Sequence, residues 1–204
     1  MIIRLLMINL AFSFILLNLI SCTTFFCSGG NFHQIDNDPK SGLAIYRSAW
    51  PDENLIKEYC KQGISEIMVL SGNAEEFESK FKELCPSLKV VYNEKQDTSI
   101  PLNEDFLKKF DQWIMDTKSS GKKIAIRCNC GSHRTGRLSA YYQMKYQNLN
   151  KEEAKKFLSE KGKWMFLFPE IYEQVDALYD YIHHKECSVV NKKNCVITSN
   201  YAHL

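Results

Sequence analysis

The sequence predicts an α/β fold with a central, mostly parallel twisted sheet of four to five strands and helices on both faces. From Gly42 onward, short β-rich runs alternate with amphipathic helical patterns. Helices of about 10–15 residues between strands are typical of parallel sheets covered on both faces. The chain has 204 residues, 45% of them hydrophobic, which suffices for one domain with its own core.

The predicted strands are the short apolar runs, and the predicted helices are the longer periodic segments between them. Asn103 is a predicted helix cap because Glu104 and Asp105 follow it in the first turn, where the helix dipole favours anions. The aromatic run Trp164–Phe168 is expected to pack in the core between two helices. The strands are Leu43–Arg47, Glu66–Leu70, Leu88–Tyr92 and Lys123–Arg127, and the helices are Asp52–Gln62, Ala74–Leu84, Asn103–Lys118, Thr135–Asn148, Lys151–Lys161 and Pro169–His183.

The first 21 residues have the pattern of a secretory signal peptide: one cation, Arg4, precedes the apolar run Leu5–Ile20. The segment Leu19–Cys22 resembles the lipobox of bacterial lipoproteins, in which cleavage leaves a cysteine to be lipidated. We expect a signal peptide over 1–21, a lipid-anchored tether over 22–41, and export to the periplasm or cell surface. A plain cleaved signal and an uncleaved membrane anchor remain alternatives.

The net charge and the cysteines narrow the function classes further. A formal net charge of +2 argues against a general nucleic-acid binder. With Cys22 lipidated, seven of the eight cysteines remain, and thiols outside the cytoplasm tend to pair. An odd number leaves at least one sulfur free. Cys187 and Cys195 flank a short polar segment that a disulfide could close into a small loop.

The segment after the last predicted strand carries the chemistry. Three of the five arginines, Arg127, Arg134 and Arg137, fall within eleven residues. The strand ends at Cys128, a short glycine-containing loop follows, and a helix begins near Thr135. Ligands of parallel sheets bind at the carboxyl ends of strands, and N–H groups at a helix N-terminus attract anions. The sequence therefore predicts an anion cradle with a cysteine at its base.

This segment resembles the cysteine-dependent phosphatases of the protein-tyrosine and dual-specificity superfamily, whose loop reads His-Cys-x5-Arg-Ser/Thr. Cys128 and Arg134 match the spacing, Gly131 matches the mid-loop glycine, and Thr135 matches the hydroxyl residue after the arginine. The resemblance extends over about residues 42–183. It implies a tyrosine-phosphatase-like fold, with the phosphatase domain over residues 42–185 and a tail without a clear element over 186–204.

Two shorter matches refine the resemblance. The run Ile45–Pro51 is similar to the opening strand of the compact dual-specificity group. The run Gly131–Gly136 is especially similar to the branch that acts on inositol phosphates.

The resemblance implies roles for the matching residues. Cys128 would attack as a thiolate and form a phosphocysteine, Arg134 would hold two phosphate oxygens, and Thr135 would ease departure of the sulfur. No metal or other cofactor is required. The phosphate-binding loop would consist of Asn129, Cys130, Gly131, Ser132, His133 and Arg134.

Two loop positions are unusual. Arg127 stands where the family has the histidine that organises the loop, and its positive charge is expected to favour the thiolate. Cys130, two residues from Cys128, is either the partner of a protective reversible disulfide with the nucleophile or a small loop residue. A metal site made of Cys128, Cys130 and His133 is disfavoured because Arg134 would repel the cation.

The general acid is expected to be Asp97, which lies in a loop after a strand, 31 residues before Cys128. Glu94 ranks second, and Asp105, which falls in a helix, ranks below it. Asp52 follows Trp50 and Pro51, as in the acid loop of larger tyrosine phosphatases, but the spacing and the helix that begins there argue against it.

The leading hypothesis is an exported, monomeric phosphomonoesterase that acts on inositol polyphosphates or on phosphotyrosine proteins, with inositol phosphates favoured. It would contact the membrane through its N-terminal lipid and would not bind nucleic acid. The alternatives are a rhodanese-like sulfurtransferase, which Arg134 disfavours, and a catalytically inactive phosphate-binding module, which the unusual Arg127 makes conceivable.

Overall fold

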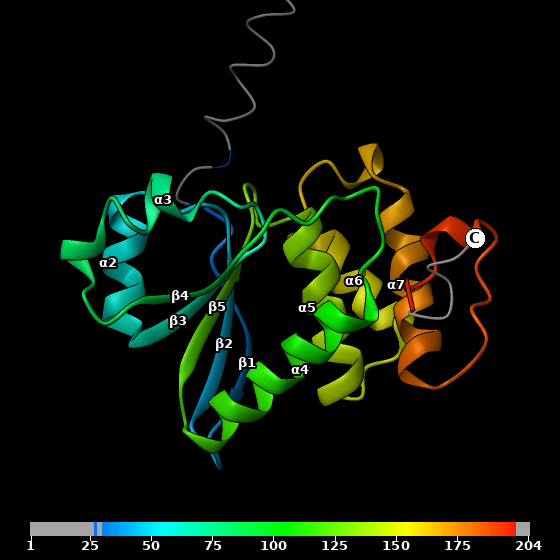
Figure 1. Cartoon of the computed structure of the whole chain (residues 1–204), viewed down its shortest axis with the longest axis horizontal. Coiled ribbons are helices and arrows are strands. Elements are labelled where there is room, and N and C mark those ends of the chain that lie inside the picture. The colour runs from blue at the N-terminus through cyan, green and yellow to red at the C-terminus, as the bar shows by residue number, and fades with distance from the viewer. Residues whose placement is uncertain (1–26, 28–29, 199–204) are drawn as a thin grey trace, which may run out of the picture.

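The computed structural model describes residue 27 and residues 30–198. The predicted signal peptide and Cys22 lie outside these residues. A five-stranded sheet in the order β1-β2-β5-β3-β4 forms the centre of the fold (Figure 1). The strands are β1 (His33–Asp38), β2 (Leu43–Ser48), β3 (Ile64–Val69), β4 (Lys89–Asn93) and β5 (Lys123–Arg127). All neighbours pair in parallel except β1 and β2, so the predicted fold class is confirmed.

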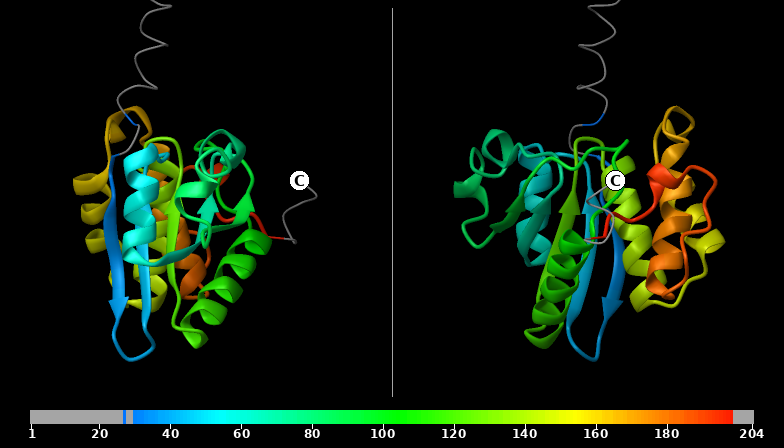
Figure 2. Two further views of the ribbon diagram at one scale, coloured as in Figure 1. Left: turned by 90° about the vertical axis from the view of Figure 1, so that its left-hand side faces the viewer. Right: turned by 45° about the vertical axis from the view of Figure 1, so that its right-hand side comes forward.

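Helices cover both faces of the sheet, and the alternation of side chains along β5 explains why. Ile124 and Ile126 point into the larger apolar cluster, whereas Ala125 belongs to the smaller one on the opposite face. The smaller cluster packs under α2 (Glu53–Gln62) and α3 (Ala74–Phe77). The larger cluster packs under α4 (Glu104–Ser119), α5 (His133–Tyr146), α6 (Lys151–Lys161) and α7 (Glu170–Ile182), as Figures 1 and 2 show.

Local capping fixes where two of these helices begin. The Asn103 side chain accepts a hydrogen bond from the backbone N–H of Phe106 at 2.7 Å, which confirms the predicted cap of α4. Asp52 caps α2 in the same way by accepting from the N–H of Leu55 at 2.9 Å. The predicted helix Ala74–Leu84 is instead two short pieces, α3 and the 3₁₀ turn Lys82–Leu84. Glu78, between them, is buried and turns toward β5.

The tether prediction is wrong at its C-terminal end. Residues His33–Asp38, placed in the predicted tether over 22–41, form β1 and pair antiparallel with β2. Its sequence, HQIDND, carries only one large apolar residue, Ile35, because β1 is an edge strand that buries little. The ordered domain therefore begins before residue 42.

The C-terminal tail is also more ordered than expected. The disulfide between Cys187 and Cys195 closes the small loop that the spacing suggested. Beyond it, the backbone of Ile197 bonds to Leu102 and Glu104 and so fastens the tail to the start of α4. Within residues 30–198, no helix is long and apolar enough to cross a bilayer.

Candidate active site

The loop from Cys128 to Arg134 connects the carboxyl end of β5 to the N-terminus of α5. Cys128 is 1% exposed and is the one free cysteine among the residues that the structure describes. Gly131 lies at φ 65° against β2, and a Cβ there would come within 2.4 Å of the Ser48 carbonyl group. Only glycine therefore lets the loop close this tightly.

The surroundings of Cys128 favour the thiolate. Burial opposes ionisation, but Arg134, the Thr135 hydroxyl and backbone N–H groups of Thr135 and Gly131 together hold the pKa of Cys128 below its ordinary value. The Arg134 guanidinium donates to the carbonyl oxygen of Leu70 at 3.2 Å, which holds its side chain at the end of β3. A thiolate below a guanidinium and a helix N-terminus is suited to attack a phosphate.

Arg127 does not supply the positive potential expected of it. Its Nε donates to Glu78 at 2.5 Å, a second nitrogen bonds the other carboxylate oxygen, and both side chains are buried. Two further bonds, each 2.7 Å, run to Ser71 and Asn73. In a strand, alternate residues share a face, so Arg127 lies on the same side as Ala125, toward α3. Its charge is neutralised there, and it anchors the loop after β3.

A different arginine, which the sequence analysis missed, approaches the loop. Arg47 on β2 is fully buried, and its Nη2 donates to the carbonyl oxygen of Gly131. Burial lowers the pKa of Arg47 to about 10, while the negative charge of Cys128 opposes that shift. Arg47 can thus organise the loop and face the thiolate, as the family's histidine would. The sequence feature that could have identified Arg47 is its position near the end of β2, the strand that pairs with β5.

Cys130 forms a disulfide with Cys27, so neither alternative from the sequence holds: Cys130 does not pair with Cys128, and it is more than a small loop residue. Asn31 strengthens the attachment by donating to the Cys130 carbonyl oxygen at 3.1 Å. The phosphate loop is therefore fastened covalently to the segment that precedes β1.

Asp97 is exposed on the loop between β4 and α4. Its carboxylate accepts hydrogen bonds from the N–H and the hydroxyl of Ser99 at 2.9 and 2.8 Å. These bonds lower the pKa of Asp97, and the positive charges of Lys95 and Arg134 add to the effect. In the free protein these interactions favour the charged Asp97 carboxylate.

Two buried side chains, also missed by the sequence analysis, hold the Asp97 loop from behind. Arg137 on α5 donates to the carbonyl oxygens of Asp97 at 3.0 Å and Ile100 at 2.8 Å. Arg137 also bonds Gln174 of α7, which donates to the carbonyl oxygen of Thr98 at 3.1 Å. The only sequence signal is that Arg137 belongs to the arginine cluster.

The alternative acids and His133 have other contacts in the structure. Asp52 caps α2, Asp105 lies in the first turn of α4, and Glu94 is exposed and accepts from the Tyr92 hydroxyl at 3.2 Å. His133 packs against Phe168 with ring centroids 3.9 Å apart, and burial lowers the pKa of His133. Among the described residues no three His, Cys, Asp or Glu side chains form a group that could hold a metal ion.

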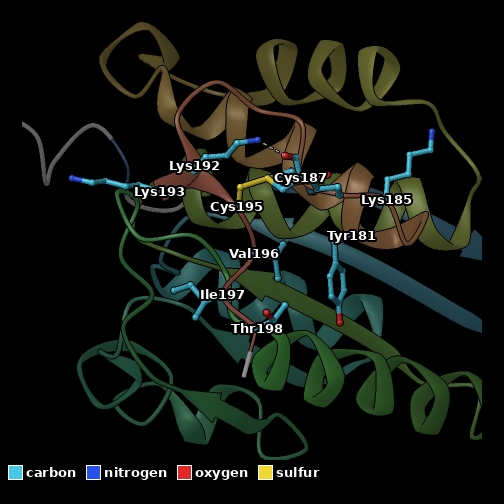
Figure 3. Close-up of a pocket in the computed structure, with 11 residues that line it drawn as sticks. Tyr181, Lys185, Cys187, Lys192, Lys193, Cys195, Val196, Ile197 and Thr198 are labelled. Carbon is cyan, nitrogen blue, oxygen red and sulfur yellow. Dashed lines mark hydrogen bonds between the residues drawn. A yellow bond between two sulfur atoms is a disulfide. The ribbon is translucent and has the colours of Figure 1, made fainter. Parts of the chain in front are cut away.

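A cavity of about 670 Å³ lies away from this loop, between α7 and the C-terminal tail (Figure 3). Its lining is mainly apolar and includes Tyr181, Val196 and the Cys187–Cys195 disulfide. Lys192 donates to the Cys187 carbonyl oxygen at 2.6 Å, and Figure 3 shows Lys185 and Lys193 pointing outward. This cavity lacks the converging cations of a phosphate site.

The family model described as the catalytic domain of dual specificity phosphatases matches residues 52–181, more than half of the chain. The chain belongs to the dual-specificity phosphatase family. It is a cysteine-dependent phosphatase, which overturns the sulfurtransferase alternative.

Solved structures agree on the fold. The Siw14 catalytic core is 21% identical, with 77% of this chain and 90% of that chain covered at a TM-score of 0.57. PTPMT1 in complex with PI(5)P is 15% identical, with 76% of this chain and 98% of that chain covered at a TM-score of 0.58. TpbA of P. aeruginosa in complex with pTyr is 15% identical, with 74% of this chain and 95% of that chain covered at a TM-score of 0.55. No curated protein matches significantly.

Proposed function

We propose that this phosphatase is an exported, lipid-anchored phosphomonoesterase in which Cys128 is the nucleophile. The observation that carries the proposal is Cys128 itself, the one free cysteine within residues 27 and 30–198, which is buried at the base of the loop and whose pKa is held down by Arg134 and the start of α5. Every other described cysteine is in a disulfide, so the thiol chemistry of this part of the chain is confined to Cys128.

The reaction would proceed in two displacements. In the first, the Cys128 thiolate attacks phosphorus, the S–P bond forms, the bond from phosphorus to the leaving oxygen breaks, and Asp97 gives that oxygen its proton. In the second, water attacks the phosphocysteine and passes a proton to the Asp97 carboxylate. The S–P bond then breaks, inorganic phosphate forms, and a hydrogen bond from Thr135 stabilises the departing thiolate. Arg134 holds the equatorial oxygens throughout.

Asp97 must carry a proton when substrate binds, although its bonds to Ser99 favour the carboxylate. A bound phosphate dianion would raise the pKa of Asp97 because like charges repel. Arg137 and Gln174 would act as positioning residues, since they bond backbone carbonyl oxygens of the acid loop and not the Asp97 carboxylate, which Ser99 bonds.

The favoured substrates are phosphomonoesters of inositol, supported by the similarity of Gly131–Gly136 to the inositol-phosphate branch. Phosphotyrosine is the second candidate, because the TpbA structure with a similar fold is a complex with pTyr. Rates measured on phytate, lower inositol phosphates and a phosphotyrosine peptide test this choice. A higher kcat/KM on the peptide would reverse it.

Export is supported by the signal-like first 21 residues and by three disulfides, which persist in oxidising compartments. Mass spectrometry of the native protein should find a chain that starts at an acylated Cys22. A mature chain that starts elsewhere would contradict the lipid anchor.

A further inference from the structure

The loop between α6 and α7 exposes large apolar side chains. Phe166 is 77% exposed, Leu167 58% and Trp164 43%. The expectation that the run Trp164–Phe168 packs in the core is therefore wrong for these three, and only Met165 is buried. Trp164 adopts a φ of 54°, a left-handed conformation that is uncommon for a bulky residue. Neighbouring exposed apolar side chains of this size mark interaction surfaces.

This apolar loop lies beside the phosphate loop. The backbone N–H of Lys163 donates to the Ser132 hydroxyl at 3.0 Å, and Phe168 packs on His133. The acid loop adds Ile100, which is 53% exposed. Large apolar side chains thus stand on two of the loops that surround the candidate site.

The segment before β1, which includes Cys27 and Asn31, contacts the phosphate loop beside the apolar loop. Asn31 donates to the Ser132 hydroxyl at 3.4 Å, so one hydroxyl joins the N-terminal segment and the apolar loop. The disulfide of Cys27 with Cys130 adds a covalent link. In both views of Figure 2, the start of the described chain before β1, drawn in blue, and the α6–α7 loop lie at the same end of the molecule.

The length of chain before Cys27 limits how far the phosphate loop can stand from a membrane. Cys22 is five residues before Cys27, and five extended residues span at most about 18 Å. If the apolar run Leu5–Ile20 is not cleaved and remains in the membrane, its end lies only seven residues before Cys27, so the distance from the membrane is limited in a similar way. Because Cys27 is bonded to Cys130, the anchor restrains the phosphate loop itself and not merely the domain.

We propose that the apolar rim, defined as Ile100, Trp164, Phe166 and Leu167, is a membrane-docking surface that presents the phosphate loop to phosphomonoesters on lipid headgroups. This rests on the proposed function and narrows its substrate class to inositol phosphates carried by lipids. Aromatic and aliphatic side chains insert at the bilayer interface, and Lys161 lies three residues before Trp164, where a lysine suits anionic headgroups.

The first test uses the mature, acylated protein in phosphatidylcholine vesicles that contain a phosphatidylinositol monophosphate. Replacing Phe166→Ser and Leu167→Ser together should lower the rate on the vesicle substrate about tenfold or more, because two inserted side chains are lost. The rate on soluble p-nitrophenyl phosphate should not change. The matched control is Met115→Ser on α4, where the apolar side chain is 52% exposed. It should change neither the rate on vesicles nor the rate on p-nitrophenyl phosphate.

The second test follows the fluorescence of Trp164 in vesicles with brominated acyl chains. The wild type should be quenched, and Trp164→Phe, which retains Trp50 and Trp113, should lose the quenched component. Unquenched Trp164, or equal losses by the double variant on vesicles and on p-nitrophenyl phosphate, would overturn docking. So would a loss confined to a phosphotyrosine peptide, which would indicate a protein partner. A wild type inactive on p-nitrophenyl phosphate would instead contradict the proposed function.

Discussion

Arg137 donates to the carbonyl oxygen of Asp97 at 3.0 Å and thereby joins the helix behind the phosphate loop to the loop that carries the candidate acid. Arg137 lies on α5, three residues after Arg134. The helix that carries Arg134, the proposed phosphate clamp, thus also fixes the backbone of Asp97, the proposed acid. We expect the relative position of nucleophile and acid to depend on this buried guanidinium.

Replacing Arg137→Met should loosen the acid loop without removing a group that touches substrate. We expect kcat on an inositol phosphate to fall about 10–100-fold, because acid catalysis is worth about 100–10,000-fold and depends on geometry. On p-nitrophenyl phosphate, whose leaving group needs little protonation, the loss should be small. Gln174→Leu, which removes the bond to Thr98 and one bond of Arg137, should show the same pattern more weakly. Equal losses on both substrates would indicate general misfolding.

Asp97→Asn should lower kcat/KM by about 100–10,000-fold on an alkyl phosphate and much less on p-nitrophenyl phosphate. The alkoxide leaves poorly without a proton, whereas the nitrophenolate leaves readily. Asp52→Asn is the matched control, because asparagine can also accept the capping bond from the Leu55 N–H, so this variant should change neither the fold nor the rate appreciably. A larger rate effect at Asp52 would reassign the acid.

Ser99→Ala should shift the pH profile in a defined direction. The Ser99 hydroxyl stabilises the carboxylate of Asp97, so its loss should raise the pKa of Asp97. The acid works while protonated, and the high-pH limb of kcat/KM should therefore move to higher pH. The low-pH limb, which reports the Cys128 thiolate, should stay in place. A shift of the high-pH limb to lower pH would contradict the assignment.

Some of this molecule follows from local sequence. The strand Lys123–Arg127 and the helix Lys151–Lys161 match their predicted bounds, because apolar periodicity and capping act over a few residues. Cys128 and Arg134 could be predicted from the sequence because both lie in one short, continuous loop with a recognisable spacing. Seven of the eight cysteines lie within the described residues, and three disulfides among seven leave one sulfur free, as expected once Cys22 is set aside.

The contacts that surround the loop are of a different kind. Arg47 reaches Gly131 over 84 positions, Arg127 reaches Glu78 over 49, and Arg137 reaches Ile100 over 37. No spacing rule relates such pairs, since they depend on the face to which each strand or helix residue points. The polar edge strand β1 was missed because its alternation carries so little apolar signal.

Removing one charge of the buried Arg127–Glu78 pair should lower stability strongly. Glu78→Gln would leave a buried guanidinium without its counter-charge, so the free energy of unfolding should fall by about 3–5 kcal/mol. Arg127→Met combined with Glu78→Met should cost less than Glu78→Gln alone, because no buried charge is left unpaired. Denaturant titrations of the variants measure this. An unchanged midpoint for Glu78→Gln would show that the pair contributes little.

The central claim is that Cys128 carries the phosphoryl group. The most direct test is to quench the enzyme during turnover of p-nitrophenyl phosphate and to locate the covalent phosphate by mass spectrometry. We predict phosphocysteine at Cys128 in the wild type, and no adduct and less than about a tenth of the wild-type rate in Cys128→Ser. Phosphate on another residue, or a Cys128→Ser variant that keeps about a tenth or more of the rate, would contradict the account.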